Sequence, residues 1–493
     1  MTPPNARDDP ASRTDMTWRA LALWALSGIA FGIRAAGLGV QGFWFDEAYT
    51  HWIARLSLGD AWQVVVADGV HPPLYYAVAR AALLLGQSEA FLRLPSAILG
   101  ALTVPAIFRL AARWAGPSTG WIAALLLAVS PIHVWYSTDA RMYALLAFLG
   151  AVCMLAYTAW LERPGALNAA AFVAASMLAY LTHYFALFLP LVQFIHLVLN
   201  LRHNPRAFRA WVGLQALAAV PLAGWIYALS RREAQFFGIG WIPVPRLADL
   251  LGTLVNFTTG YVREPRWWQW VIALGCLLLA AHGLRSAGQE PRRRTLLLLW
   301  AVTPPLVALA LSIRRPVYMD RFLIISLPAF LLLVARGVSL LPRRAVIPAA
   351  VGLIALMALA MAQFGFWPGH VREQWREAAG RLERAGPGEA IVVRVLQIAV
   401  PLSYYYQGPL ALEAMEVNRR VTPLSELARG HDGVWLVYWN AAADIHRVAS
   451  NPAFRPEAEV ELEAASWLAG EGPPLLERLD YVGVTLLHFG DSP

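Results

Sequence analysis

Long apolar runs separated by short polar connections fill most of the chain before residue 368. Many of these runs reach about 18–20 residues, the length at which an α-helix crosses a bilayer. They predict a multi-span α-helical membrane protein with about eleven transmembrane helices. The expected spans cover residues 17–39, 91–110, 118–135, 141–161, 167–182, 184–200, 211–229, 268–284, 295–313, 321–338 and 345–366.

A further apolar run at about 72–86, within the stretch that begins HPPLYY, is too short to be a convincing span. It starts with two prolines, and we expect it to form a helix that lies at the outer membrane interface. The first outer loop, about residues 40–90, would then contain interfacial helices. The alternative is a twelfth span, which would invert every later loop and place most arginine clusters outside.

Arginines cluster in alternate connections between the runs. Cytoplasmic loops carry an excess of basic residues, so these clusters indicate the cytoplasmic side. The amino terminus is then expected inside and the carboxyl terminus outside. The clusters are Arg109 with Arg113; Arg163; Arg202 with Arg206 and Arg209; Arg285 with Arg292, Arg293 and Arg294; and Arg336 with Arg343 and Arg344.

The pattern changes after about residue 368, where charge rises and the apolar runs shorten. REQWREAAGRLERAG, at residues 372–386, has helical spacing, whereas EAIVVRV, GVWLVYW and YVGVTLLHF are typical of strands. We therefore expect a transmembrane domain over residues 1–368 and a small extracytoplasmic α/β domain over residues 369–493.

Composition supports the membrane assignment. The chain is 58% hydrophobic and contains 21 Trp, a residue that favours membrane–water interfaces. Its net charge of +8 comes from arginines in loops, with no Lys, and does not indicate a nucleic-acid partner. The two cysteines, Cys153 and Cys276, lie in apolar runs and exclude a disulfide framework. The first apolar run is long enough to be retained as a signal anchor.

The stretch FWFDEAYTHW, residues 43–52, places two adjacent carboxylates directly after the first expected span. Asp46 and Glu47 point about 100° apart if the stretch is helical, so they need not share one role. One reading is an N-cap, in which Asp46 satisfies free amides and complements the helix dipole. The other is a catalytic role, because a carboxylate is a suitable general base.

The same outer rim is expected to collect several cations and phenols. Convergent cations are what a phosphate leaving group requires. Taken singly, each residue also has a structural explanation, such as an arginine whose charge reaches the interface. The candidates are His71, Asp139, Arg141, Tyr143, His183, Tyr184, Arg314, Arg315, Tyr318, Asp320 and Arg321.

Five motifs occur in order: the Asp-Glu pair in its aromatic setting, HPPLYY, RLPSAILGALTV (93–104), SPIHVWYSTDARMYAL (130–145) and THYFALFLPLVQ (182–193). Together they resemble the bacterial branch of the dolichyl-phosphate-mannose protein mannosyltransferases (glycosyltransferase family 39-like), a group that includes the aminoarabinose transferases. The likeness covers about residues 17–200. It is fainter over residues 310–340 and at QWREAAGRLERAG.

The resemblance implies a GT-C fold in the bacterial cytoplasmic membrane. It also implies inverting transfer of a sugar from a polyprenyl-phosphate donor to a glycan, lipid or protein acceptor at the outer face. Asp46 falls at the position of the family's catalytic carboxylate, and Glu47 is the second member of that pair. His71 stands where aminoarabinose transferases have a Lys that contacts the lipid phosphate, a departure that weakens the case for a lipid A acceptor.

On this model the donor phosphate meets His71, Arg141, Arg315 and Arg321. The remaining substrate contacts are assigned to Asp139, Tyr143, His183, Tyr184 and Tyr318.

No cofactor is required by this chemistry. A divalent metal remains an option at Asp46, Glu47 and His71, although their spacing matches no standard metal motif. The chain has no glycine-rich nucleotide loop, which favours a lipid-linked donor. A transporter and a non-catalytic lipid- or glycan-binding assembly protein are the alternatives. The absence of an internal repeat and the position of the ionisable groups on the rim argue against a transporter.

Overall fold

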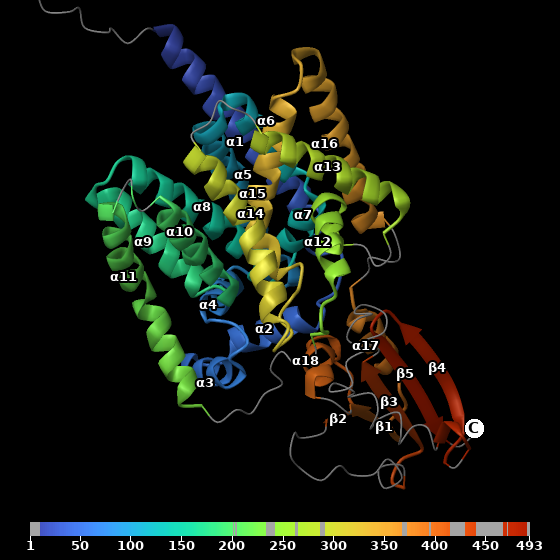
Figure 1. Ribbon diagram of the computed structural model, residues 1–493. Coiled ribbons are helices and arrows are strands. Elements are labelled where there is room, and N and C mark those ends of the chain that lie inside the picture. Colours follow the sequence, from blue (N-terminus) through green and yellow to red (C-terminus); the bar gives the residue numbers. More distant parts are fainter. Residues whose placement is uncertain are drawn as a thin grey trace, which may run out of the picture.

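The computed structural model describes residues 10–200, 202, 205–232, 242–261, 265–285, 291–366, 372–393, 396–414, 429–439, 467–470 and 472–490. Helices form one large body, and a small sheet extends from one end of it (Figure 1). The helices up to residue 366 are α1 (Pro10–Ala35), α2 (Phe45–Arg55), α3 (Leu58–Asp68), α4 (Leu74–Leu83), α5 (Glu89–Ala115), α6 (Pro117–Ala128), α7 (Pro131–Ser137), α8 (Tyr143–Glu162), α9 (Ala166–Tyr180), η1 (Tyr184–Leu187), α10 (Phe188–Leu199), α11 (Pro205–Ser230), α12 (Leu247–Thr259), α13 (Trp267–Arg285), α14 (Pro291–Leu311), η2 (Phe322–Ser326), α15 (Leu327–Ser339) and α16 (Arg343–Phe366).

Each expected span coincides with helical structure, but fewer helices qualify as full spans. Within the described residues, seven are long and apolar enough to cross a membrane, or eight if the bent pair α6–α7 is one span. The seven are α5, α8, α11, α13, α14, η2 with α15, and α16. The other expected spans correspond to α1 and to the shorter apolar segments α9 and η1–α10. A multi-span helical membrane protein is thus confirmed, with seven or eight candidate spans in place of about eleven.

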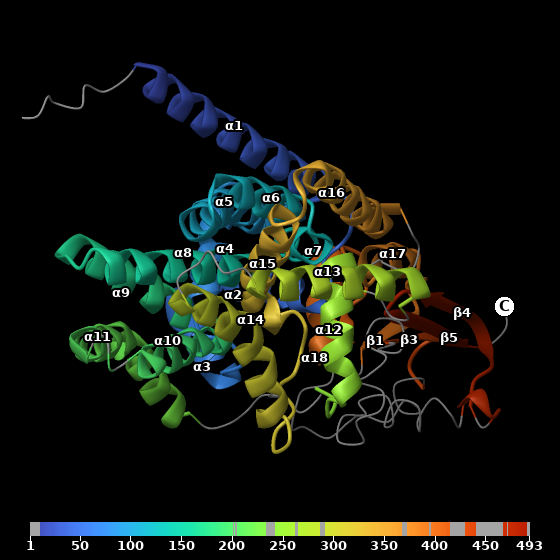
Figure 2. The same cartoon turned by 45° about the horizontal axis from the view of Figure 1, so that its top comes forward.

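The bend of 57° between α6 and α7 has a visible cause. Pro131 begins α7 and has no N–H to continue the α6 hydrogen-bond ladder. The carbonyls of Leu127 and Ala128, at the end of α6, accept from the buried Arg34 of α1 at 3.4 Å and 3.2 Å. Figure 2 shows α1 lying across α5 and α6. This arginine supplies the donor that a broken helix needs inside the bundle.

Close helix packing in the middle of the body depends on glycine. A Cβ atom at Gly337 of α15 would collide with the backbone of Leu279 in α13, and one at Gly283 would meet the Leu333 carbonyl. Small residues at such crossings let helix backbones approach each other in a membrane protein. The contact holds α13 against α15, which is almost entirely buried.

The first expected outer loop contains three short helices, α2, α3 and α4. The run at about 72–86 forms α4, whose ten residues are too few to span, so the expected non-spanning helix is confirmed. Gly69 ends α3 in the left-handed conformation, with a φ of 60°, and starts the turn into α4. The Leu74 amide then donates to the Leu181 carbonyl at 3.0 Å. This bond ties the start of α4 to the end of α9 and places His71 beside His183.

The carboxyl-terminal region folds around a mixed five-stranded sheet with strand order β2-β1-β3-β5-β4. Strand β1 is parallel to β2 and β3, and β5 is antiparallel to β3 and β4. The expected helix and three strands are confirmed; β2, β4 and α18 were not predicted. The elements are α17 (Trp375–Leu382), β1 (Glu389–Val393), α18 (Leu396–Tyr405), β2 (Leu412–Ala414), β3 (Gly433–Trp439), β4 (Leu475–Tyr481) and β5 (Val484–Gly490).

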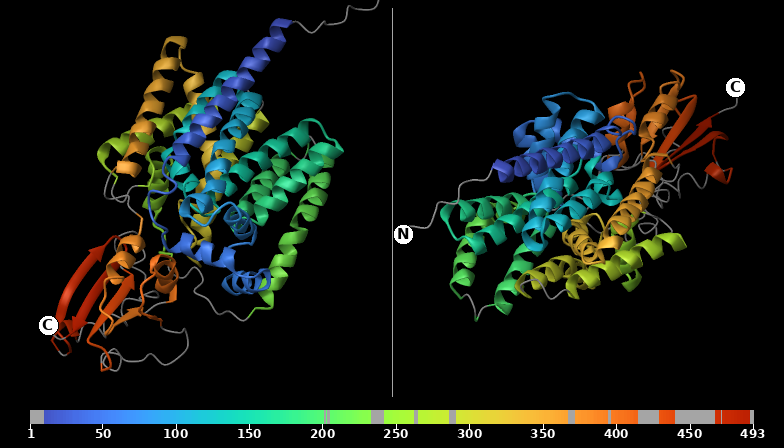
Figure 3. Two further views of the ribbon diagram at one scale, coloured as in Figure 1. Left: turned by 180° about the vertical axis from the view of Figure 1, so that it is seen from behind. Right: turned by 90° about the horizontal axis from the view of Figure 1, so that it is seen from above.

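The sheet and the three short helices occupy the same end of the molecule. The view from behind in Figure 3 and the view in Figure 1 both show α2–α4 and the sheet at that end. Helix α18 packs directly against α2. This placement agrees with the expectation that the first outer loop and the carboxyl-terminal region share one side of the membrane.

Candidate functional site

The site is built around the first turn of α2. Trp44 is the N-cap residue and provides no side-chain acceptor. The amide of Phe45 instead donates to Glu373 Oε2 at 2.9 Å. Asp46 therefore is not the N-cap of this helix, although Asp46 and Glu47 both lie in the first turn, where negative charge complements the dipole. The capping carboxylate comes from the segment just before α17.

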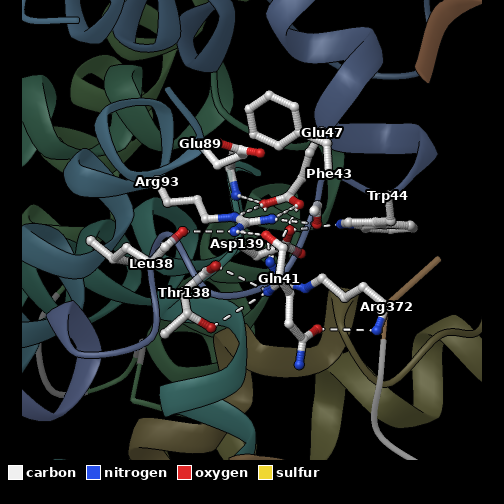
Figure 4. A network of polar contacts seen from close by, with 12 residues as sticks. Leu38, Gln41, Phe43, Trp44, Glu47, Glu89, Arg93, Thr138, Asp139 and Arg372 are labelled. Atoms are coloured by element: carbon white, nitrogen blue, oxygen red, sulfur yellow. Dashed lines mark hydrogen bonds and ion pairs between the residues drawn. The ribbon is translucent and has the colours of Figure 1, made fainter. Parts of the chain in front are cut away.

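Glu47 is fully buried and is surrounded by donors (Figure 4). Arg93 binds it in a bidentate pair, Nε to Oε1 at 2.7 Å and Nη2 to Oε2 at 2.5 Å. The Ala140 amide adds a bond to Oε1 at 2.8 Å, and Arg372 Nη1 lies 3.3 Å from both oxygens. Burial opposes the charged form, but Arg372 and Arg93 outweigh it and lower the pKa of Glu47 to about 2. Glu47 is thus a permanently charged anchor.

Arg372 connects the segment just before α17 to Glu47. Its Nη2 donates to the Thr138 carbonyl at 3.0 Å, and its guanidinium lies 5.1 Å from the Trp135 ring centroid. The next residue, Glu373, accepts from Phe45 as described and from the indoles of Trp375 and Trp439. Two consecutive residues therefore hold the start of α2 from outside the helical body.

Asp139 is buried beside the same network. Its Oδ1 accepts from Trp44 Nε1 at 2.8 Å. Burial and then the negative charge of Glu47 raise the pKa of Asp139 to about 7, with Arg372 acting in the opposite direction. Asp139 is therefore partly protonated at neutral pH, while Glu47 stays ionised.

Asp46 faces a different environment. Its side chain is 20% exposed, and Oδ2 lies 3.8 Å from Arg141 Nε and 3.9 Å from Arg321 Nη1. These distances are too long for hydrogen bonds, so the two cations balance the carboxylate without closing around it. Arg141 is held by α2 itself, since its Nη1 donates to Thr50 Oγ1 at 3.1 Å and to the Asp46 carbonyl at 3.3 Å.

Aromatic rings enclose Arg321. Its guanidinium lies 5.6 Å from the ring centroid of Trp44, 5.8 Å from that of Tyr143 and 5.5 Å from that of Phe322. Such faces stabilise a cation that has been removed from water. We call the group formed by Asp46, Arg141, Tyr143, Arg321 and the two histidines described next the Asp46 chamber.

His71 and His183 lie next to each other in the chamber, with ring centroids 5.2 Å apart and ring planes tilted by 37°. Burial, followed by the positive charges of Arg141 and Arg321, lowers the pKa of His183 to about 3. The pKa of His71 is also well below its ordinary value, chiefly through burial and then Arg141. Both imidazoles are therefore neutral and offer hydrogen bonds, so His71 does not act as a cation here.

Several polar atoms of the chamber lack partners. Buried polar groups are almost always hydrogen-bonded, so a cluster of unpartnered ones indicates a place where a ligand or water binds. In the chamber, the buried atoms without a hydrogen-bond partner include Arg141 Nε, Tyr143 Oη, His71 Nδ1 and His183 Nε2.

The remaining predicted site residues lie outside this group. Tyr184 Oη donates to the Gly69 carbonyl at 2.9 Å and accepts from Trp225, so it braces the α3–α4 turn. Tyr318 pairs with Thr253 of α12 at 2.8 Å. Arg315 is exposed and makes no side-chain hydrogen bond or ion pair within the described residues.

Sequence reasoning missed Arg93, Arg372, Glu373 and Asp68. Asp68, at the end of α3, has its pKa raised to about 6 by burial, while Arg141 opposes that shift. An arginine such as Arg93 inside an apolar run is itself a signal, because a charge there needs a buried partner. No comparable local signal marks Arg372, which contacts Glu47 and Thr138 across 325 and 234 residues of chain.

The described residues contain no group of three or more His, Cys, Asp or Glu side chains arranged to hold a metal ion. Of the three candidates for such a site, Glu47 already accepts hydrogen bonds from Arg93 on both carboxylate oxygens.

Comparisons with known proteins agree with the fold and with the resemblance seen in the sequence. Residues 70–227 match the family model described as dolichyl-phosphate-mannose-protein mannosyltransferase. ArnT from Cupriavidus metallidurans in the apo state aligns with a TM-score of 0.62 at 14% identity, over 96% of this chain and 98% of that one. The structure of that protein bound to undecaprenyl phosphate gives the same TM-score and coverage at 15% identity.

The archaeal oligosaccharyltransferase AglB from Archaeoglobus fulgidus, in complex with an inhibitory peptide and a dolichol-phosphate, aligns with a TM-score of 0.51 at 12% identity. That alignment covers 81% of this chain and 65% of that one. No curated protein matches the chain by sequence. The resemblance to this mannosyltransferase family and the ArnT-like GT-C fold are thus confirmed.

Proposed function

We propose that the protein is an inverting glycosyltransferase that moves a sugar from a polyprenyl-phosphate donor to a cell-envelope acceptor at the outer face of the cytoplasmic membrane. The observation that carries the proposal is the Asp46 chamber. A partly exposed carboxylate lies between two buried arginines, and further unpartnered polar atoms line the same space. A base next to a phosphate-binding pair is what transfer from a sugar phosphate requires.

In the proposed reaction, Asp46 accepts the proton of an acceptor hydroxyl while that oxygen bonds to the anomeric carbon. The bond from this carbon to the phosphate oxygen breaks on the opposite face of the sugar, which inverts the configuration. The electron pair leaves with the polyprenyl phosphate, and Arg141 and Arg321 stabilise the added negative charge. The planar guanidinium fork suits a phosphate, with which it forms paired charge-assisted hydrogen bonds.

The long distances around Asp46 have a consequence for the order of events. Without donor, Arg141 and Arg321 are the nearest counter-charges to the carboxylate. A phosphate bound by these arginines would draw their charge away from Asp46. The carboxylate would then be left to accept a hydrogen bond from the acceptor hydroxyl.

The other predicted residues take supporting roles. Tyr143, His71 and His183 offer hydrogen bonds to the sugar or phosphate from the chamber wall. Glu47 acts as a positioning residue, since its oxygens are already bound by Arg93, Arg372 and the Ala140 amide.

Three predicted residues lie further out. In this proposal Arg315 makes a peripheral electrostatic contribution. Tyr184 and Tyr318 shape the surrounding loops.

The experiment is transfer of labelled sugar from a polyprenyl monophosphate donor and from the matching nucleotide sugar, with a membrane extract as the acceptor. We expect transfer from the lipid-linked donor only, and none by Asp46→Asn. Efficient use of the nucleotide sugar without a lipid-linked intermediate would contradict the proposal. Movement of an intact solute across proteoliposomes without sugar transfer would favour a transporter. Activity that persists after chelation would support the view that no metal is required.

A further inference from the structure

A cavity lies between the membrane-associated helices and the carboxyl-terminal region. Its volume is about 650 Å³, and its walls come from α2, α4, the connection into α5, and α18. The polar residues that line it include His51, Arg55, Arg80, Gln87, Glu89 and Tyr404. The cavity therefore joins parts of the chain that are more than three hundred residues apart.

The cavity is separate from the Asp46 chamber, although both border α2. Arg55 follows Asp46 by nine residues, which corresponds to a rotation of about 180° and a rise of about 13 Å along the helix. Asp46 and Arg55 therefore lie on opposite faces of α2. A ligand in this cavity is not placed to receive the reacting atoms at Asp46.

The charge of the cavity is positive on balance. Glu89 is the acid among its lining residues, and it is already bound by Arg376 at 2.7 Å and by Tyr405 Oη at 2.9 Å. Arg80 uses one nitrogen to hold the carbonyls of Ala54 and Leu56 at the end of α2, but its charge remains at the cavity wall.

Two groups of the cavity remain available for a ligand. Arg55 is exposed and makes no side-chain hydrogen bond or ion pair with any described residue. His51 is only 4% exposed, yet its Nε2 has no partner in the described part of the chain. A buried, unpartnered ring nitrogen in the wall of a cationic cavity indicates a missing hydrogen-bonding ligand.

Exposed apolar side chains lie beside the cavity, and they indicate the chemical class of its ligand. Leu84 is 86% exposed and Leu85 is 65% exposed, and Leu84 also lines the cavity. Leucines this exposed, next to helices of a membrane protein, are expected to contact lipid. An anionic group in the cavity would thus lie next to acyl chains that cover these leucines.

We propose that this cavity binds the phosphate-bearing headgroup of a membrane lipid whose headgroup has a net negative charge. The phosphate would contact Arg55 and the Nε2 atom of His51 near the charge of Arg80, and the acyl chains would lie along Leu84 and Leu85. The lipid would bridge α2, α4 and α18, and so would hold the carboxyl-terminal region at the membrane surface. This inference is independent of the proposed transfer reaction.

The test is equilibrium binding of radiolabelled dioctanoyl phosphatidic acid to the full-length protein in an uncharged detergent. The Arg141→Gln variant serves as the background, so that phosphate binding in the Asp46 chamber does not contribute. We expect saturable binding of one lipid, with affinity reduced at least about fivefold by Arg55→Gln, because one charged donor is lost. His51→Gln should also weaken it. The matched control is Arg109→Gln. This variant removes an exposed arginine near the end of α5 that lies away from the cavity, and it should leave the affinity for the lipid unchanged.

Competition identifies the source of the phosphate. Unlabelled dioctanoyl phosphatidic acid should displace the probe, whereas dioctanoyl phosphatidylcholine or inorganic phosphate at the same concentration should not. Displacement by inorganic phosphate as efficient as that by the lipid would overturn the lipid part of the proposal. Equal affinity in Arg55→Gln and its parent, with both proteins monodisperse, would overturn the site itself.

Discussion

Asp46 and Glu47 are neighbours in the chain, but their carboxylates meet opposite surroundings. Glu47 has no exposed surface and is held by two arginines and a backbone amide. Asp46 remains partly exposed, and its arginines lie at 3.8 Å and 3.9 Å. The difference follows from the rotation of about 100° between adjacent helical residues. One side of α2 can thus be fixed in the protein while the next side faces a chamber.

The different surroundings of the two carboxylates suit them to different roles. A carboxylate that receives several short charge-assisted bonds is stabilised in its ionised form and is a poor proton acceptor. A carboxylate whose counter-charges can move to a substrate keeps its acceptor capacity. In the proposed mechanism, Asp46 is therefore the base and Glu47 is the residue that holds Asp46 in place.

The largest effect is expected for Asp46→Asn. Transfer should fall by about 10²–10⁴-fold, because a positioned general base contributes about that factor. Thermal stability should fall less than in Glu47→Gln, since the ion pairs of Asp46 are long and its carboxylate is partly exposed. Initial rates with a lipid-linked donor and melting curves in the same detergent provide the measurements. Asp60→Asn, at an exposed carboxylate of α3, is the matched control. Retention of more than about a tenth of the wild-type rate would be too much for a lost general base.

The next effect concerns the cations of the chamber. Arg141→Gln and Arg321→Gln should each lower kcat/KM by about 10²-fold, a typical loss for one charge-stabilising donor. Each loss should be smaller than that of Asp46→Asn, because the two arginines share the phosphate charge. Arg315→Gln, at an exposed arginine, should change the rate only slightly. Equal losses in Arg315→Gln and Arg141→Gln would place the donor phosphate outside the chamber.

Glu47→Gln should mainly reduce stability. The change leaves Arg93 and Arg372 buried without their counter-charge, which typically costs about 3–5 kcal/mol. Glu162→Gln, which affects an exposed ion pair with Arg113, is the control and should cost about 1 kcal/mol or less.

The destabilisation by Glu47→Gln should also depend on pH. The pKa of Glu47 is lowered from its ordinary value of 4.5 to about 2, so its stabilisation is present above pH 4.5 and is lost as pH falls through about 2. The difference in melting temperature between wild type and Glu47→Gln should therefore narrow over that range. A constant difference would show that Glu47 does not stabilise the fold through its charge.

The sequence predicted the elements of the molecule better than their exact membrane roles. Apolar runs located the helices because burial in lipid requires long apolar stretches, whichever way the chain packs. They could not show that α9 is only 15 residues long or that α6 and α7 are bent apart, since the bend depends on Pro131 and on a contact from Arg34. The short strand β2 and the edge strand β4 lack the apolar runs that marked β3 and β5.

The site was predictable in part for a similar reason. Local motifs identified Asp46, Arg141 and Arg321, and the structure brings all three together. The difference between Asp46 and Glu47 was not predictable, because it depends on Arg93 and Arg372, which contact Glu47 across 46 and 325 residues of chain. Such pairings are tertiary, and no local spacing encodes them.

The smallest effect is expected for Asp139→Asn. This variant tests whether the charge of Glu47 influences the ionisation of Asp139. Burial and the Glu47 charge raise the pKa of Asp139 from an ordinary value of 3.8 to about 7. The stability that its bound proton contributes is therefore present below about pH 3.8 and is lost as pH rises through about 7. An asparagine cannot ionise and can still accept the bond from Trp44, so the variant lacks this loss. From pH 6 to pH 8, the free energy of unfolding of Asp139→Asn should therefore rise by about 1 kcal/mol relative to that of the wild type. Melting curves of both proteins at these two pH values, with Asp60→Asn as the control, provide the measurement. Parallel pH profiles for wild type and Asp139→Asn would mean that Asp139 is ionised throughout this range and that the charge of Glu47 does not reach it.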